Sequence, residues 1–503
     1  MSNQLQALPE KVLNWVDERF PLTSTWKAHV SEYYAPKNFN FWYFFGSLAM
    51  LVLVIQIVTG IFLTMNYKPD GNLIPGTNIS VAFASVEYIM RDVAGGWIIR
   101  YMHSTGASMF FVVVYLHMFR GLIYGSYKQP RELVWVFGTL IFLILMAEAF
   151  LGYLLPWGQM SFWGAQVIVN LFASIPVIGP DLSVLIRGDF VVSDATLNRF
   201  FALHVIAVPL VLLALVVAHL VALHEVGSNN PDGVEIKKNK DPVTHIPLDG
   251  IPFHPYYTVK DILGVSVFLA VFCAILFFAP EMGGFFLEHP NFDPADALKT
   301  PPHIAPVWYF TPFYAILRAI PSLLGTQVWG VLGMGAGVVV IAFLPWLDRS
   351  PVKSVRYRGS RFKTMLILFI IAFIGLGILG AKPSTNIRAD ISKVLTVVYF
   401  SFFLTMPLYT QVLSQAARKL STAIVAAIMV AAFFLLQIGS LFGVLAYLAS
   451  AIAILWVIYN DAEDKGIVPV PERVTFSTGK QQAMFLVYAT IAIVGAYLFG
   501  TLI

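Results

Sequence analysis

The sequence has few charged residues and almost no cysteine. Charged residues make up 12% of its 503 residues and hydrophobic residues 58%, with a mean hydropathy of +0.75. Soluble domains are about 25% charged and about 45–50% apolar, so a water-soluble fold is excluded. The small net charge of +4 argues against disorder and nucleic-acid binding. The one cysteine, Cys273, excludes an intrachain disulfide, a Cys-x-x-Cys pair, a cysteine-bound iron–sulfur cluster and a covalent c-type haem.

Residues 1–38 lack the apolar segment of a signal peptide and carry acidic residues among the basic ones. We expect them to form a polar, partly amphipathic segment on the membrane surface. The remainder predicts an all-α integral membrane protein with eleven stretches long enough to cross about 30 Å of hydrocarbon. A break at 437–440 separates the ninth stretch from the tenth. The predicted spans lie near 40–66, 97–120, 133–155, 198–223, 260–280, 327–347, 363–381, 392–412, 421–438, 441–459 and 482–503.

The lysines and arginines predict the orientation of these spans. With the N-terminus in the cytoplasm, 22 of the 32 basic residues fall on the cytoplasmic side, as the positive-inside rule requires. The connections 157–196 and 281–325 are too long to be simple turns, and both lie outside in this topology. Long ordered loops are usually functional.

Four histidines inside predicted spans are spaced as two matched pairs. His103 and His117 are 14 residues apart, and His204 and His219 are 15 apart. Four helical turns take about 14.4 residues, so each pair lies on one helix face, about 21–22 Å apart along the axis. The two spans run parallel, which sets His103 level with His204 (the outer pair) and His117 level with His219 (the inner pair). Two facing imidazoles are the ligands of an electron-transfer haem; hydrogen bonding between helices or proton relay is the alternative.

Glycines repeat the same spacing on the neighbouring spans. Gly46 and Gly60 are 14 residues apart, and so are Gly138 and Gly152. We expect Gly46 and Gly138 at the depth of the inner pair, and Gly60 and Gly152 at the depth of the outer pair. Faces without side chains would admit a flat macrocycle into a four-helix bundle. Packing of small residues between helices is the alternative.

Two arginines lie three residues from predicted ligands. Arg100 and Arg120 stand near the two ends of the second span. They are candidates to pair with haem propionates. The alternative is that they anchor the helix at the membrane interface by snorkelling.

Several motifs in order resemble one family. The sequence resembles cytochrome b of the cytochrome bc complex (respiratory complex III, quinol:cytochrome c oxidoreductase), in a bacterial form with a C-terminal extension, over about residues 20–415. The resemblance divides the chain into a surface segment (1–38), a dihaem bundle (39–230), a C-terminal family domain (231–415) and an extension (416–503). The motifs are Arg100–His103, His117–Tyr127, Gly152–Ala165, Arg199–His204, His219–Pro231, Pro345–Pro351 and Arg356–Gly359.

The resemblance implies two non-covalent b haems, of low potential at the outer pair and of high potential at the inner pair. It implies that quinol oxidised outside gives one electron to a Rieske iron–sulfur protein and one to the outer haem. The inner haem then reduces quinone inside, and protons are translocated. A c-type cytochrome subunit, a second copy of the chain and the lipid of a bacterial inner membrane are the other implied partners.

The resemblance also assigns residues to two quinone sites. At an inner site, a histidine and a carboxylate beside a quinone can deliver protons to it; interfacial exposure of His224 and a first-turn helix charge for Asp261 are the alternatives. The residues carried over are Tyr153, Gly158, Tyr309 and Tyr314 for the outer site, and His224, Ser228, Lys260 and Asp261 for the inner site, with Ser126 as a cofactor-binding residue.

The sequence departs from the family at the outer site. The common motif there is Pro-Glu-Trp-Tyr, but Val307 replaces the glutamate that usually accepts a quinol proton. Glu148 stands in an apolar run on the third span, where a carboxylate is costly unless protonated or partnered. We hypothesise that Glu148 takes over the proton role. A neutral glutamic acid bonded to another helix is the alternative.

Two further features depart from the usual pattern. The spacing of 15 between His204 and His219 resembles chloroplast-type relatives, whereas mitochondrial members usually have 14, and Pro209 between them predicts a kink that absorbs the extra residue. The extension 416–503 has no histidine, so we expect it to be peripheral and to pack against the core, another subunit or lipid.

Two other functions are alternatives to the main one: another dihaem quinone-linked membrane cytochrome, and a transporter with intramembrane histidines.

Overall fold

The computed structural model describes residues 2–460 and 473–480, with six further positions between 483 and 495. Within this part of the chain, nine helical segments are long and apolar enough to cross a membrane. The described residues form helices apart from one small two-stranded sheet and the loops. The nine segments are Phe41–Thr64, Gly96–Tyr124, Glu132–Leu154, Asp194–Val226, Tyr256–Phe278, Val328–Leu347, Ser360–Gly380, Gln415–Leu435 and Leu441–Tyr459.

Nine of the eleven predicted spans are therefore confirmed as helices of suitable length and composition, and two are not. The predicted eighth span is a helix, α16 (Asn386–Leu404), but its first turns carry Arg388, Asp390 and Lys393, and it is not among the nine. The predicted span 482–503 lies outside the continuously described residues. The break at 437–440 is confirmed, because α18 ends at Leu435 and α19 begins at Leu441.

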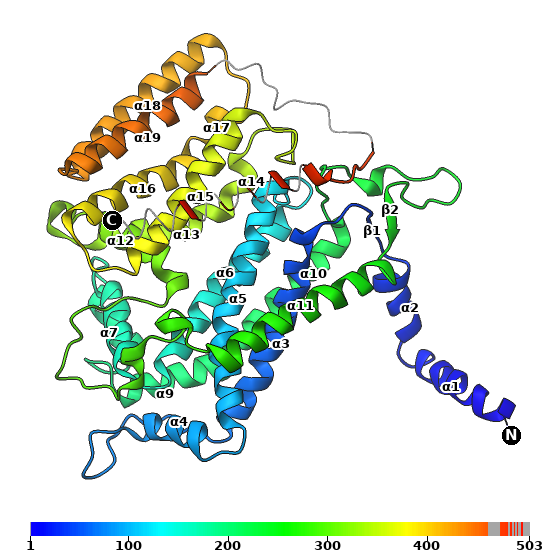
Figure 1. Ribbon diagram of the computed structural model, residues 1–503, viewed down its shortest axis with the longest axis horizontal. Helices are drawn as coiled ribbons and strands as arrows, with labels where there is room; N and C mark the ends of the chain where they lie inside the picture. Colours follow the sequence, from blue (N-terminus) through cyan, green and yellow to red (C-terminus); the bar gives the residue numbers. More distant parts are fainter. Residues whose placement is uncertain are drawn as a thin grey trace.

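Four long helices form the bundle in the first half of the chain (Figure 1). Helix α3 packs against α5, and α6 packs against α10. Their side chains are mostly apolar because one face contacts lipid and the other packs against helices, and neither environment provides water to hydrogen-bond a polar group. Their bounds are α3 Phe44–Thr64, α5 Gly96–Tyr124, α6 Glu132–Leu154 and α10 Val208–Val226, and α11 (Tyr256–Phe278) lies alongside α3 and α5.

The fourth span contains a π-helical turn. Helix α9 (Asp194–Ala202) continues into η3 (Leu203–Ala207), a π-helix that includes His204, and then into α10. A π-helical turn accommodates one more residue than an α-helical turn. The extra residue between the two histidines is thus absorbed here, before Pro209, and the kink at the proline stays a prediction.

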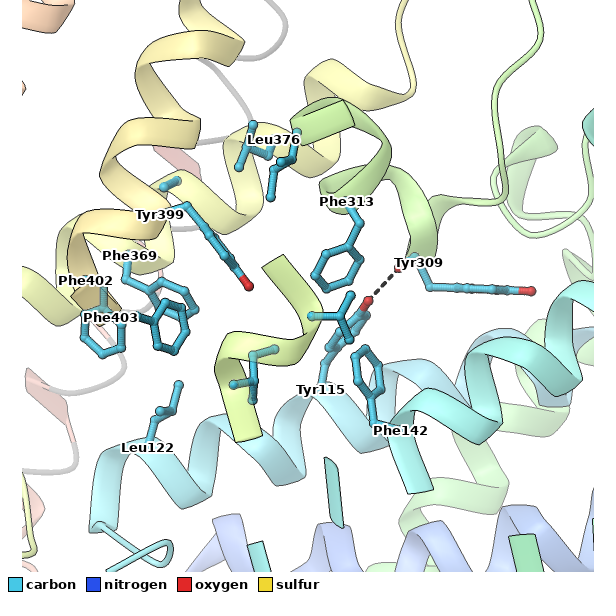
Figure 2. Packing of buried hydrophobic residues seen from close by; sticks show 14 of the residues in the cluster. Tyr115, Leu122, Phe142, Tyr309, Phe313, Phe369, Leu376, Tyr399, Phe402 and Phe403 are labelled. Carbon is cyan, nitrogen blue, oxygen red and sulfur yellow. Dashed lines mark hydrogen bonds between the residues drawn. The ribbon is translucent and has the colours of Figure 1, made fainter. Parts of the chain in front are cut away.

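The second half of the chain is built on an aromatic core. Helices α12 (Thr311–Ala319), α15 (Ser360–Gly380) and α16 pack together, and Figure 2 shows Phe369, Tyr399 and Phe402 gathered between them. The Phe369 and Phe402 rings stack with centroids 4.5 Å apart. Helices α13 (Val328–Val339) and α14 (Leu344–Leu347) precede α15. This core supports the segment that carries Tyr309.

The two long predicted outer connections meet each other. The first contains α7 (Gln159–Ala173) and α8 (Gly179–Arg187), and the second contains the short turns η6 (His289–Phe292) and η7 (Trp308–Phe310). Gly158 pairs with Pro294 in an antiparallel bridge. A Cβ atom at Gly158 would overlap the carbonyl oxygen of Asn291, so only glycine permits this approach.

The extension begins as a helical hairpin beside the family core. Helices α18 (Gln415–Leu435) and α19 (Leu441–Tyr459) form the pair that stands at the upper left of Figure 1, and α19 packs on α16. The Asp390 carboxylate of α16 accepts hydrogen bonds from the amides of Gly439 (3.1 Å) and Ser440 (2.7 Å). The prediction of peripheral packing against the core is confirmed for these residues.

The N-terminal segment has helices and one strand. Helix α1 (Ser2–Asp17) projects from the bundle in Figure 1, and α2 (Leu22–Trp26) follows. Strand β1 (Tyr34–Pro36) pairs antiparallel with β2 (Gly250–Pro252), which precedes α11. Other short helical elements include α4 (Val81–Arg91) before α5, α17 (Met406–Tyr409) after α16, and a π-helical turn at Lys27–Ser31.

Candidate functional site: two histidine pairs and flanking loops

The outer pair meets inside the bundle. The rings of His103 and His204 face each other with centroids 6.2 Å apart. The Nδ1 atom of His103 lies 2.9 Å from the Thr59 hydroxyl. The Nδ1 atom of His204 lies 3.0 Å from the Glu148 carbonyl oxygen and 3.0 Å from its carboxylate. These contacts hold each ring by Nδ1 and leave its Nε2 for another partner.

The inner pair has a similar ring separation, with the ring planes at 69° instead of the 88° of the outer pair. The rings of His117 and His219 have centroids 6.4 Å apart. Because α5 and the continuous segment η3–α10 bring both pairs together at matching positions, the two helices run parallel, as predicted. The chain therefore presents paired imidazoles at two depths, set by helix periodicity and the π-helical turn at His204.

The distance within each pair fits a metal ion between the rings. An imidazole nitrogen lies about 2.0–2.1 Å from a bound first-row metal such as zinc and roughly 1 Å from its own ring centroid, so two opposed ligand rings have centroids roughly 6–6.5 Å apart. Both pairs fall in this range. Direct hydrogen bonding between the two rings would bring them closer together.

All four predicted glycines lie against the paired histidines. A Cβ atom at Gly46 would stand 3.4 Å from the His117 ring, and one at Gly60 would stand 3.3 Å from His103. The other helix repeats this arrangement, with Gly138 against His219 and Gly152 against His204. The predicted depths are confirmed. The missing side chains keep space open at both levels of the bundle.

The two arginines differ in their contacts. Arg120 donates a hydrogen bond to the Ser126 hydroxyl (3.1 Å) and lies over the Tyr43 ring, 4.9 Å from its centroid. Its Nε atom is buried and has no hydrogen-bond partner among the described residues, which leaves a donor for an anionic group such as a propionate. Arg100 is half-buried at the start of α5, one turn before His103.

Glu148 lies beside a histidine of the outer pair. One carboxylate oxygen contacts His204, and the other is buried without a partner. The hypothesis that Glu148 accepts a quinol proton is not tested by this geometry and stays a prediction. The contact gives the residue a second possible task, which is to orient the imidazole and raise its basicity.

We expect Glu148→Gln to change the redox potential measured for a b haem at the outer pair. Glutamine keeps the volume but replaces the carboxyl group 3.0 Å from His204 Nδ1 with an amide, so the contact that orients the ligand and tunes its basicity changes. A redox titration of purified complex, followed by absorbance, measures this. An unchanged potential would contradict the orienting task. Unchanged turnover across pH would contradict the proton task.

The predicted outer quinone residues come from three separate segments. Tyr153 is in the last turn of α6, Gly158 precedes α7, and Tyr309 belongs to η7. The Tyr309 ring stacks on the Phe111 ring, with centroids 3.9 Å apart. In Figure 2 the Tyr309 hydroxyl points away from the aromatic core. Tyr314 is on α12, and the Cζ atom of Arg318 lies over its ring, 4.9 Å from the ring centroid.

Glu288 was not identified from the sequence. The Tyr153 hydroxyl donates a hydrogen bond of 3.0 Å to its carboxylate. Burial raises the pKa of Glu288 to about 7, although the hydrogen bond from Tyr153 opposes this. Burial and the Glu288 charge together raise the pKa of Tyr309. A lone acid in a proline-rich loop carries no periodic signal, so sequence reasoning could not place it beside Tyr153.

The predicted inner quinone residues have separate partners. His224 lies 3.3 Å from His29 (Nδ1 to Nδ1), and its ring is 4.9 Å from that of Tyr33. Asp261 accepts a hydrogen bond from Ser47 (3.2 Å). Sequence reasoning missed the N-terminal segment as part of this region. The remaining residues are Lys260, which lies over the Tyr257 ring, and Ser228, which is partly exposed after α10.

The fold and the paired histidines define a multi-pass membrane protein whose helix bundle presents two imidazole pairs at two depths. A family model described as cytochrome b/b6/petB matches residues 30–227, and one described as cytochrome b(C-terminal)/b6/petD matches residues 294–400. The chain is 63% identical to cytochrome b of Allochromatium vinosum over 401 residues, which are 79% of this chain and 95% of the relative.

Further similarities agree. The chain is 50% identical to cytochrome b of Rhodospirillum rubrum over 394 residues, which are 78% of this chain and 91% of the relative. It resembles a chain of a hyperthermophilic respiratory complex III, with a TM-score of 0.71, 39% identity, and coverage of 78% of this chain and 98% of that one. The chain belongs to the cytochrome b family, and the resemblance seen in its motifs is confirmed.

Proposed function

We propose that this chain is the transmembrane electron-transfer subunit of a quinol:cytochrome c oxidoreductase. Quinol is oxidised at an outer site, electrons cross the membrane through two b haems, and quinone is reduced at an inner site, with net proton translocation. The observation that carries the proposal is the pair of facing histidines at each of two depths, 6.2 and 6.4 Å between ring centroids. Quinol-linked electron transfer is the function that membership of this family implies.

The residues at the two pairs fit the haem-binding task. His103 with His204, and His117 with His219, would supply the axial nitrogens of a low-potential and a high-potential haem respectively. A bis-histidine haem accepts and donates single electrons and has no open coordination position. Thr59 fixes the His103 ring by its Nδ1 atom. The residues that make room or pair with propionates would be Gly46, Gly60, Gly138, Gly152, Arg100, Arg120 and Ser126.

The two quinone sites use groups near the ends of the bundle. At the outer site, Tyr153 and Tyr309 would border the quinol headgroup, and Gly158 lets the two long loops approach each other. At the inner site, His224 and Asp261 would supply protons to the reduced quinone. Tyr314 at the outer site, and Ser228 and Lys260 at the inner site, complete the proposed sets.

The proposed partners follow from what the chain lacks. It has one cysteine and no Cys-x-x-Cys-His segment, so it offers no thiolate set for an iron–sulfur cluster and no covalent haem attachment. A Rieske iron–sulfur protein and a c-type cytochrome would therefore be separate subunits. We place the complex, as a homodimer, in a bacterial inner membrane with the N-terminus of this chain in the cytoplasm.

A difference spectrum and two inhibitors test the proposal. The dithionite-reduced minus oxidised spectrum of purified complex should show two b haems of different potential, and quinol should reduce them. A stigmatellin-type inhibitor should block quinol oxidation, and an antimycin-type inhibitor should block reoxidation of the inner haem. A colourless protein would contradict the proposal. A haem protein insensitive to both inhibitors would favour another dihaem membrane cytochrome.

A further inference from the structure

The outer quinol site lacks the acid that its motif normally provides. Val307 is buried, with 3% of its surface exposed, and stands where the resemblance to the family leads us to expect glutamate. Quinol cannot be oxidised to quinone without losing two protons, so a base is needed at this site. Neither Tyr153 nor Tyr309 can serve, because a neutral phenol is a weak base.

Glu288 provides a carboxylate at the same place from a different loop. Its side chain accepts the Tyr153 hydroxyl hydrogen bond at 3.0 Å and lies within electrostatic range of Tyr309. The loop that carries it packs on the motif segment, since the Phe285 ring stacks with Trp308 at 5.6 Å. The surface of Glu288 is only partly buried, so a bound quinol can reach its carboxylate.

We propose that Glu288 is the proton acceptor of the outer quinol site and replaces the glutamate missing at Val307. This assignment rests on the proposed function of that site. In the step, one quinol O–H bond breaks, and its proton bonds to a Glu288 carboxylate oxygen. The quinol anion that remains loses two electrons, to the iron–sulfur protein and to the b-haem chain, and its second proton is released, giving quinone.

The surroundings of Glu288 make it suitable for this task. Tyr153 from α6 and Tyr309 from η7 are the titratable groups that face it, and both are neutral at physiological pH. With a pKa of about 7, the carboxyl is charged above that pH and can accept a proton. Below it the group is protonated and blocked. Quinol oxidation should therefore slow as the pH falls through about 7.

The test uses the whole complex in membranes. We expect Glu288→Gln to slow quinol oxidation by about 10²-fold, the lower end of the range for general base catalysis, and to remove the pH dependence near 7. Glutamine keeps the volume and can still accept the Tyr153 hydrogen bond. The matched control is Glu281→Gln, an acid of the same loop whose contacts are Tyr101 and His289, and it should behave as wild type.

A second change distinguishes a chemical task from a structural one. Adding Val307→Glu to the Glu288→Gln variant returns a carboxylate to the motif position and should restore much of the rate. If Glu288→Gln disturbs the haem spectra, Glu288→Asp replaces it, and this variant should keep the pH dependence at a lower rate.

Two outcomes separate the assignment from the proposed function. Inhibitor-sensitive reduction of the b haems by quinol in the wild type tests the function alone. A wild-type rate and pH profile in Glu288→Gln would overturn the assignment while leaving that function intact. The assignment would also be overturned if Glu148→Gln lost the pH dependence while Glu288→Gln kept it. That result would place the proton acceptor at Glu148.

Discussion

His219→Ala should remove the inner b haem and leave the outer one in place. Each iron would depend on two imidazoles, and the inner pair shares no ligand with the outer pair. Removing one ligand leaves a half-coordinated site next to the space that Gly138 keeps open. The difference spectrum of the purified variant should lose the high-potential signal only, and reduction of quinone at the inner site should stop.

The matched control is His254→Ala, which changes an exposed histidine on the loop before α11. It should leave both signals unchanged. Equal loss of both haems in His219→Ala, or retention of both, would contradict the assignment of two independent pairs. The corresponding change in the outer pair, His103→Ala, should remove the low-potential signal instead.

Asp348→Ala should destabilise the protein by about 3–5 kcal/mol, the usual cost of breaking a buried ion pair. Asp348 is 6% exposed, and its carboxylate contacts the Lys128 ammonium (3.0 Å), the Arg358 guanidinium and the Tyr127 hydroxyl (2.5 Å). The cluster joins the connection between α5 and α6 to the loop after α14. Removing the carboxylate leaves two cations facing each other without a counterion.

The same cluster predicts a loss of stability in acid. Burial by itself raises the pKa of Asp348, but the charges of Arg358 and Lys128 outweigh it and hold the pKa below its usual range. A depressed carboxyl pKa contributes stability above the unfolded value of about 3.9 and loses it as the pH falls further. The stabilising contribution should therefore decline as the pH falls below about 4 and be lost as the pH passes the lowered pKa of Asp348.

Thermal unfolding of the detergent-extracted protein, followed by haem absorbance, measures both effects. The exposed acid Asp92 gives the control, because Asp92→Asn should move the midpoint little. A midpoint for Asp348→Ala equal to that of the wild type would contradict the importance of the cluster.

Features governed by local periodicity were predictable. A span needs about 20 apolar residues, so, in the part of the chain that the structure describes, nine helices appear where the sequence expects them. Residues 14 or 15 apart return to the same helix face, so the two histidine pairs and their four glycines meet as predicted. The exceptions are α16, whose charged first turns set it apart from the nine, and the π-helical turn at His204.

Contacts between distant segments were not predictable. Glu288 meets Tyr153 across 135 residues, and His29 meets His224 across 195. Nothing in their local sequence marks them, since an isolated acid in a loop and a histidine in a polar N-terminal segment are common. The hypothesis for Glu148 shows the same limit: its apolar surroundings were visible in the sequence, but its neighbour His204 was not.

The sequence by itself determined that this is a multi-pass membrane protein with two levels of paired histidines, because helix geometry converts spacing directly into depth. The tertiary structure alone decided which acid lies beside Tyr153, at the proposed outer quinol site, and which ion cluster joins the two halves. Those choices depend on how loops fold over the ends of the helices, where no repeat in the sequence constrains the chain.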